Sequence, residues 1–417
     1  MTELGEIPIE WEVVNLEDLA DINRGASPRP IKDPKWFSEE SEIGWVRIAD
    51  VTKSKKYLRQ TVQYLSDEGV LKSRYVKHGD LIMSICGTIG RPVILAMEAC
   101  IHDGFVVFNN MDVNKIDKNF LIYILNSLED YFKSQGQPGT QVNINTSIVG
   151  KTSLALPPIK EQQKIAEILF TVDEQIENTD KIIEKTKELK KGLMQQLFTR
   201  GIGHTEFKNT ELGKIPKEWT LIKLEQITER ITYGFTNPMP TTEKGPFMIT
   251  AKDIINGRIN YITARKTDEQ KYKQELTPKS RPEINDILIT KDGTLGRLAI
   301  VDKENICINQ SVASIKVNET LVFVKYLFYL MDSPTIQSRI LFDAGGSTIK
   351  HIYISKLAQM IIPISMSLEE QQKIAEILTT LDNHIEFYEQ EKEKYSEFKK
   401  GLMQQLLTGN IRMNSMK

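Results

Sequence analysis

Apolar residues recur at alternating steps of four and three along two long segments of the chain, with a few polar positions between them. In the first segment the apolar positions are Ile165, Leu169, Val172, Ile176, Ile183, Leu193 and Leu197. In the second they are Ile374, Leu378, Leu381, Ile385, Tyr388, Tyr395, Leu402 and Leu406. A period of 3.5 residues is typical of long helices that pack as coiled coils. The pattern predicts two long amphipathic helices, each with one apolar seam.

Each predicted helix has about 40 residues and would be roughly 60 Å long at 1.5 Å per residue. Pro157 and Pro158 precede the first helix, and Gly409 follows the second. Such a helix leaves its seam in water unless it finds a partner, so we expect the two seams to pair, most simply in an antiparallel arrangement. The alternative is that each helix only completes a globular core.

The chain is an internal repeat. EQQKIAEIL at 161–169 recurs at 370–378, and KKGLMQQL at 190–197 recurs at 399–406, both 209 residues later. LGEIPIEWEVVNLEDL at 4–19 returns in altered form at 212–227, and GDLIMSICGTIGR at 79–91 is echoed at 285–297. The period is too long for a solenoid unit, so the order indicates a duplicated module of one domain followed by one helix. The two helical blocks resemble each other more closely than the two variable blocks do, and gene conversion between the helical blocks would also explain this difference.

Each of the two variable blocks mixes short strands with helices. Strand-like runs lie at 45–51, 80–85 and 104–109 in the first block and at 247–254, 286–291 and 313–317 in the second. A helical run follows in each, at 118–133 and 321–339. The predicted fold is α+β, with two mixed α/β domains separated by two long antiparallel coiled-coil-like helices and related by a pseudo-two-fold repeat. We place the boundaries at 1–155, 156–204, 205–366 and 367–417.

Composition limits the classes of protein that remain. The three cysteines contain no C-x-x-C pair, which argues against a disulfide framework and a zinc site. The N-terminus has no basic region followed by an apolar run, and the longest apolar stretches are too short to cross a bilayer. We therefore expect a cytoplasmic protein. A net charge of −2 gives no sign of nucleic-acid binding by itself, although one stretch in each half is locally basic.

Several loops combine cationic, amide, aromatic and small residues. Arg and Lys reach phosphates or guanine edges, and Asn and Gln read adenine, so these loops are candidate DNA-binding surfaces. For any one of these residues an ordinary surface charge is the more common role. The candidates are Arg24, Arg29, Lys32, Lys53, Lys55, Lys56, Arg59, Arg91, Gln141, Asn143, Arg230, Tyr233, Lys244, Arg258, Lys291, Arg297, Ser347, Lys350 and His351.

The paired sequences GTIGR at 87–91 and GTLGR at 293–297 allow two interpretations. A glycine-rich turn followed by Arg can hold a phosphate, or it can be a tight turn that a duplicated scaffold needs twice. Neither matches a P-loop or a dinucleotide fingerprint. No catalytic motif and no Cys/His cluster is found in the sequence, and His102, the one histidine beside an acid, is expected to be structural. We predict a binding protein, not an enzyme.

The repeat, the openings G-x-I-P-x-x-W at 5–11 and 213–219, and the helix entries PPIKEQQKIAEIL at 157–169 and SLEEQQKIAEIL at 367–378 resemble type I restriction–modification specificity subunits. The resemblance covers nearly the whole chain. The second helix entry departs from it, because Pro363 stands six residues before Glu369.

The resemblance implies that each variable block is a target recognition domain that reads one half of an asymmetric double-stranded DNA site. The helices would set the spacer and dock two modification (methyltransferase) subunits, which use S-adenosylmethionine to methylate adenine. Restriction subunits using ATP and Mg²⁺ would join, and this chain would bind none of these cofactors. The alternatives are a free-standing DNA-binding regulator, which would bind DNA without a methyltransferase, and a coiled-coil scaffold for protein partners, which would show no salt-dependent DNA affinity.

Overall fold

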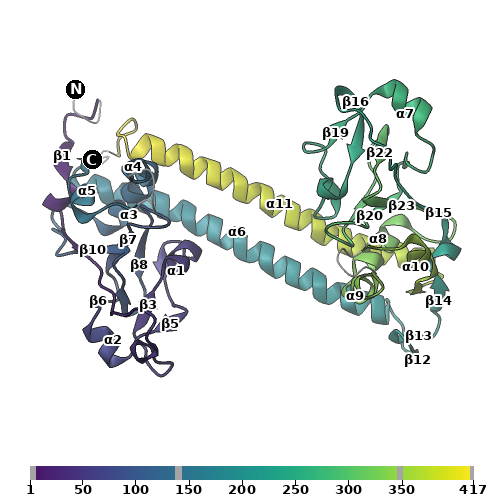
Figure 1. Cartoon of the computed structure of the whole chain (residues 1–417), viewed down its shortest axis with the longest axis horizontal. Coiled ribbons are helices and arrows are strands. Elements are labelled where there is room, and N and C mark those ends of the chain that lie inside the picture. Colours follow the sequence, from purple (N-terminus) through teal and green to yellow (C-terminus); the bar gives the residue numbers. More distant parts are fainter. Residues whose placement is uncertain (1–5, 137–142, 345–350, 414–417) are drawn as a thin grey trace. The chain divides into compact units, whose positions relative to one another are not determined.

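The computed structural model describes residues 6–136, 143–344 and 351–413 (Figure 1). These residues form two compact units. The first consists of the residues up to Thr179 and those from Glu391 onward, and the second of residues 180–390. The division passes through both long helices, α6 (Ile159–Arg200) and α11 (Leu368–Leu406). Each unit therefore contains one α/β domain, the N-terminal part of the helix that follows it, and the C-terminal part of the other helix.

Within each unit the two helix segments are antiparallel. In the second unit Lys187 pairs with Glu389 at 2.9 Å and Lys190 with Asp382 at 2.6 Å, so the α11 number falls as the α6 number rises. In the first unit Lys399 pairs with Asp173 at 2.6 Å. Asp173 and Lys190 of α6 correspond in the repeat to Asp382 and Lys399 of α11. The two long helices thus make the same ion pair twice, with donor and acceptor exchanged.

The seams predicted from the sequence lie against the domain cores. Every seam residue named above is buried or half-buried. In the first unit Ile165 and Leu169 pack in one hydrophobic cluster with Leu406. In the second, Leu197 packs with Ile374 and Leu378. The expected helix pairing is therefore present, and each seam also helps to form a globular core.

The first domain contains two sheets and a strand pair, with helices around them (Figure 1). The five-stranded sheet has the order β2 (Asp21–Arg24), β10 (Phe105–Asn109), β7 (Leu81–Ser84), β8 (Pro92–Leu95) and β4 (Tyr57–Leu58). The four-stranded sheet has the order β5 (Gln63–Tyr64), β3 (Gly44–Val46), β9 (Ala99–Ile101) and β6 (Arg74–Val76). The pair is β1 (Glu12–Asn15) with β11 (Ser153–Leu156). The helices are η1 (Leu16–Asp18), η2 (Pro34–Trp36), α1 (Ile48–Lys53), α2 (Asp67–Leu71), α3 (Lys118–Ser127), α4 (Glu129–Ser134) and α5 (Thr146–Gly150).

The second domain repeats this plan. Its four-stranded sheet has the order β15 (Thr228–Tyr233), β23 (Val312–Val317), β20 (Ile287–Thr290) and β21 (Leu298–Ile300), and its three-stranded sheet the order β19 (Arg265–Lys266), β16 (Thr242–Ile249) and β22 (Ile306–Ile308). The strand pairs are β12 (Phe207–Thr210) with β13 (Gly213–Pro216), β14 (Thr220–Lys223) with β24 (Ile361–Ile364), and β17 (Ile254–Ile255) with β18 (Arg258–Ile259). The helices are η3 (Leu224–Ile227), η4 (Ala251–Asp253), α7 (Glu269–Glu275), α8 (Val324–Asp332), α9 (Pro334–Phe342) and α10 (Ile354–Gln359).

Four elements differ from the sequence-based expectation. The helix predicted at 118–133 is divided at Leu128 into α3 and α4. The strand predicted at 45–51 ends at Val46, and helix α1 begins at Ile48, capped by an Asp50 carboxylate that accepts the Arg47 backbone N–H at 2.9 Å. The strand predicted at 247–254 likewise ends at Ile249 before η4. The helix predicted at 321–339 is divided into α8 and α9, because Pro334 cannot continue the first helix and instead begins the second.

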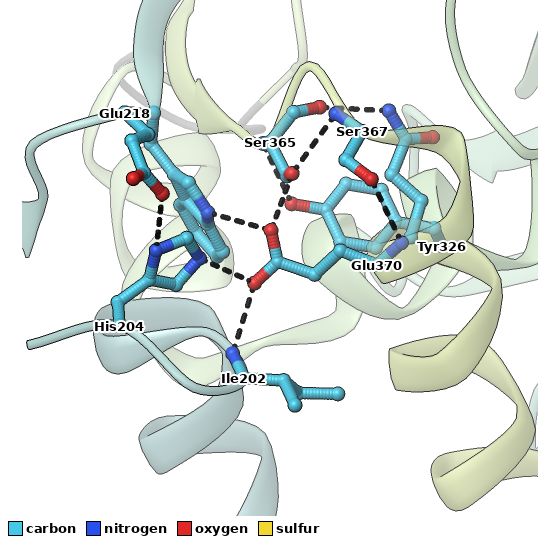
Figure 2. Close-up of polar contacts among 9 residues, drawn as sticks. Ile202, His204, Glu218, Tyr326, Ser365, Ser367 and Glu370 are labelled. Atoms are coloured by element: carbon cyan, nitrogen blue, oxygen red, sulfur yellow. Dashed lines mark hydrogen bonds and ion pairs between the residues drawn. The ribbon is translucent and has the colours of Figure 1, made fainter.

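A carboxylate attaches each domain to the start of its own long helix, with Glu161 buried and Glu370 half-buried. Glu370 of α11 accepts hydrogen bonds from Trp219 Nε1 at 3.1 Å, from the Ile202 backbone N–H at 2.9 Å and from the Ser365 hydroxyl, and contacts His204 Nε2 at 2.9 Å. Figure 2 shows these groups converging on the one side chain. Burial opposes ionisation of Glu370, but the hydrogen bonds outweigh it and hold its pKa below the ordinary value.

The first unit builds the same attachment from the two ends of its sequence. Trp11 Nε1 donates to Glu161 at 3.2 Å, and Arg412, which follows α11, donates to Glu161 at 2.9 and 3.0 Å. Arg412 also contacts Glu10. The Trp of each domain opening and the Glu of each helix entry are therefore direct partners, which explains why both recur in the repeat.

We predict that Leu169→Ala and Leu378→Ala each lower the free energy of unfolding by about 3 kcal/mol, because each removes a fully buried side chain from a packed core. Chemical denaturation measures the loss. Ile377→Ala is the matched control, since Ile377 is next to Leu378 in α11 but 39% exposed, and should cost under about 1 kcal/mol. Equal losses for Leu378 and Ile377 would contradict the packing described.

We also predict that Glu370→Ala lowers the free energy of unfolding by about 3 kcal/mol, because the buried Trp219 indole N–H loses its acceptor and the Ile202 N–H, Ser365 and His204 lose their common partner. The adjacent Glu369 is exposed and pairs with Lys373 one turn further along the same helix. Glu369→Ala should therefore cost no more than about 0.5 kcal/mol. Denaturation of both variants side by side tests the difference, and a similar cost for the two would contradict an anchoring role for Glu370.

Candidate nucleic-acid interface

The two glycine-rich turns have the same internal hydrogen bonds. In the first, the Ser84 hydroxyl accepts the Arg91 backbone N–H at 3.2 Å and donates to the Thr88 carbonyl. In the second, the Thr290 hydroxyl accepts the Arg297 backbone N–H at 2.9 Å and donates to the Thr294 carbonyl. The first and last glycines of each turn have φ between +66° and +79°, which favours glycine. The scaffold interpretation explains the repeated glycines.

The side chains of the arginines that end these turns contact backbone carbonyls of neighbouring segments outside the turns. Arg91 Nη2 donates to the Ser54 carbonyl at 3.0 Å, and its buried Nε has no hydrogen-bond partner in the part of the chain that is described. Arg297 is exposed, and its Nη1 donates to the Ile254 carbonyl at 3.4 Å. A contact of either guanidinium with DNA stays a prediction.

In the first domain, several candidates gather around Asp103, just after β9. The Asp103 carboxylate accepts the Ser27 hydroxyl at 2.6 Å and pairs with Arg29 at 3.2 Å, and Arg24 donates to the Asp103 carbonyl at 2.7 Å. The Ser27 hydrogen bond is the largest cause of a lowered pKa for Asp103. Arg29 remains 71% exposed, so most of its donors face solvent. The result is an ionised acceptor bordered by exposed cationic donors.

In the second domain the matching cluster is centred on Asp292, in the turn after β20. Lys291 Nζ lies 3.0 Å from its carboxylate, and His351 Nδ1 contacts the other oxygen. Lys291 Nζ also lies 5.6 Å from the centre of the Tyr233 ring. Burial raises the pKa of Asp292, but the hydrogen bonds of His351 and Lys291 outweigh it and keep the pKa low. The cluster again presents donors and an acceptor side by side.

The remaining candidates are scattered. Lys56 and Arg258 point to the long helices, and Arg230 is half-buried on β15. Gln141, Ser347 and Lys350 lie outside the described residues. The others are exposed side chains. Lys53 ends helix α1 and Lys244 lies within strand β16, and the rest lie outside helices and strands, namely Lys32, Lys55, Arg59 and Asn143.

Sequence reasoning found the cations of both clusters and missed the two acids at their centres. The available signal was positional, because Asp292 stands immediately before GTLGR, where the first copy has Cys86 before GTIGR. Strands β9 and β22 are equivalent in the two domains, and the residue two positions after each is Asp103 in the first domain and Gln310 in the second. The acid therefore comes from a different loop in each domain. A surface that alternates donors and acceptors suits base edges, which present both.

Three further observations concern chemistry that a DNA interface does not need. Among the described residues no group of three or more His, Cys, Asp or Glu is placed to hold a metal ion. None of the helices described is long and apolar enough to cross a membrane. Burial raises the pKa of the Cys100 thiol to about 11 and of the Cys307 thiol to about 12, so both side chains remain protonated thiols.

Comparison with known proteins identifies the class. A family model described as the type I restriction modification DNA specificity domain matches residues 8–188 and again residues 205–395. A putative type I restriction enzyme specificity subunit, MjaX, of Methanocaldococcus jannaschii is 30% identical over 99% of this chain and 96% of its own length. The MjaVIII specificity subunit of the same organism is 28% identical over 98% and 95%.

Solved structures show the same fold at low sequence identity. A type I restriction–modification S subunit from M. genitalium superposes with a TM-score of 0.58 at 16% identity, covering 98% of both chains. A chain from a structural study of assembly and conformational transition in a type I restriction–modification system superposes with a TM-score of 0.60 at 15% identity, covering 97% of this chain and all of the other.

The side chain of His102, next to Asp103 in the sequence, should make the stability of the fold depend on pH. Its ring lies 5.9 Å from Trp45 and 4.8 Å from Phe105 between centroids, and burial lowers its pKa to about 4 from an ordinary 6.5. The folded state favours the neutral ring, so this stability is complete above pH 6.5 and is lost as the pH falls toward 4. Between these values the free energy of unfolding should fall by up to about 3 kcal/mol more in the wild type than in His102→Gln.

Urea denaturation at pH 7, 5.5 and 4.5 measures this difference. His78→Gln is the control, because His78 is exposed, and it should follow the wild-type curve. A His102→Gln variant with the wild-type pH dependence would show that His102 is not the titrating group.

Proposed function

Because the chain belongs to the type I restriction–modification DNA specificity family, we propose that each of its α/β domains reads one half of a bipartite, asymmetric DNA sequence. The observation that carries the proposal is a single scaffold used twice with different surface chemistry. The sheet order β2-β10-β7-β8 of the first domain returns as β15-β23-β20-β21 in the second. The side chains gathered beside the turn differ, with Arg24, Arg29 and Asp103 in one and Tyr233, Lys291 and Asp292 in the other.

Two such surfaces suit two different half-sites. Their exposed Lys and Arg side chains would contact phosphates and give salt-dependent affinity, while the mixed donor and acceptor clusters would contact base edges. In the part of the chain that the structure describes, no feature favours a free-standing regulator or a protein-binding scaffold over this role.

The partners belong to the same proposal. The long helices would dock two methyltransferase subunits, which bind S-adenosylmethionine and methylate adenine at the site this chain selects. Restriction subunits that use ATP and Mg²⁺ would join the assembly. The chain itself would be non-catalytic, would bind none of these cofactors, and would act in the cytoplasm. The buried Cys100 and Cys307 thiols accord with a reducing compartment.

We predict that exchanging residues 16–152 for the same region of another specificity subunit changes one half of the methylated sequence and leaves the other half unchanged. This exchange keeps Trp11 and both strands of the β1–β11 pair, so the attachment to Glu161 is preserved. Methylome sequencing of cells carrying the complete system gives the result.

The reciprocal exchange of residues 224–360, which keeps Trp219 and the β14–β24 pair, should change only the other half-site. A change in both half-sites after either exchange would refute independent reading by the two domains.

A further inference from the structure

Two cations that the sequence suggested for DNA contact lie instead against the long helices. Arg258 on β18 donates hydrogen bonds from both terminal nitrogens, Nη1 and Nη2, to the carboxylate of Glu386 on α11. The Nη2–Oε2 distance is 2.6 Å. Each group shifts the other as an ion pair should, since the pKa of Arg258 is raised by Glu386 and that of Glu386 is lowered by Arg258. A fork-to-fork pair of this kind fixes direction as well as distance.

Lys56 takes the corresponding place in the first domain. It precedes β4, which pairs with β8, as β18 packs beside the equivalent strand β21. Lys56 Nζ lies 4.4 Å from the centre of the Phe170 ring of α6 and 5.7 Å from that of Tyr123. Desolvation lowers the pKa of Lys56, and the nearby Asp173 opposes that shift. The ammonium is therefore turned toward the helix and partly removed from water.

Both cations border the place where the long helices are tied to one another. In the first unit Asp173 accepts the Tyr123 hydroxyl at 2.8 Å and pairs with Lys399. In the second, Asp382 accepts the Tyr329 hydroxyl at 2.7 Å and pairs with Lys190. A domain-to-helix contact and a helix-to-helix contact are thus adjacent in each unit.

Arg258 attaches its domain to α11 further along the helix than the hydrogen bonds of Trp219 and Tyr329 do. The Trp219–Glu370 hydrogen bond lies at the start of α11 and the Tyr329–Asp382 hydrogen bond lies 12 residues further, whereas Glu386 lies 16 residues from Glu370, or about 24 Å. Contacts spread along one rigid helix restrict the direction of the domain, and the Arg258–Glu386 pair extends these contacts toward the middle of the helix.

We propose that Arg258, with Lys56 as its counterpart, is a positioning residue that orients a DNA-recognition domain on its own helix and so helps to determine which spacer length between half-sites is accepted. This inference rests on the proposed function, since it needs a bipartite site. It differs from a DNA contact in a measurable way, because a positioning residue neutralises no phosphate.

The test uses the full chain assembled with its methyltransferase subunits, on DNA duplexes that carry the native half-sites with the native spacer or a spacer one base pair longer or shorter. Arg258→Glu should lower the ratio of methylation rates between native and altered spacers by about two- to fivefold, which is the range for loss of an exposed ion pair. Combining it with Glu386→Arg reverses both charges and should restore the ratio. Arg265→Glu, an exposed arginine of the same domain, is the matched control and should leave the ratio unchanged.

A second measurement separates positioning from phosphate contact. For Arg258→Ala, the dependence of log affinity on log salt should keep its wild-type slope, whereas a lost phosphate contact would reduce the slope by about 0.9. Lys56→Met should likewise keep the wild-type salt slope. It should also lower the ratio of methylation rates between native and altered spacers, as Arg258→Glu does.

An unchanged spacer ratio in Arg258→Glu, a charge reversal that fails to restore it, or a reduced salt slope would each overturn the inference. A wild-type complex that accepts every spacer equally would also overturn the inference, whereas one that methylates no bipartite site would overturn the proposed function.

Discussion

A carboxylate with little exposure to water that accepts an indole N–H is the interaction on which both halves of this protein depend. Glu161 and Glu370 each lie in the first turns of a long helix, and each would be unfavourable there without donors. The donors come from the Trp that opens the domain and from the segment that follows the other long helix. One side chain therefore joins three parts of the chain, and the neighbouring Gln162 and Gln371 add hydrogen bonds to the loops that begin α3 and α8.

The same carboxylate shows how a repeat can be closed in two ways. In the second unit the segment after α6 continues directly into the second domain, and His204 contacts Glu370. In the first unit the segment after α11 is far from the first domain in sequence, and Arg412 bridges Glu161 and Glu10. The bidentate Arg412 therefore joins the segment after α11 to the first domain, whereas in the second unit the chain itself joins the segment after α6 to the second domain. The reciprocal pairs Lys190–Asp382 and Lys399–Asp173 continue that equivalence along the helices.

The sequence predicted the repeat, the two long helices and their pairing, because identical peptides and a 3.5-residue seam need no tertiary information. It was wrong where local rules compete. WVRIADV is rich in the apolar and β-branched residues of strands, yet Asp50 caps a helix at Ile48, and Pro334 ends one helix while beginning another. The 3.5-residue pattern indicated only helix pairing, but the seam residues also belong to the domain cores. Ile165 and Leu197 pack into these cores as well as against the partner helix.

The candidate interface was harder to predict for a physical reason. A loop rich in Arg and Lys indicates where charge is available but not where it points, and Lys56 and Arg258 point to helices, while Arg29 and Lys291 point to acids on the loop surface. The acids themselves occupy different loops in the two domains. That freedom follows from the scaffold, because each turn is held by a Ser or Thr hydroxyl and by backbone groups that do not depend on the neighbouring side chains. Residues such as Cys86 and Asp292 can therefore differ at one position without altering the strands that carry them, which is the property that a reader of changing DNA sequences requires.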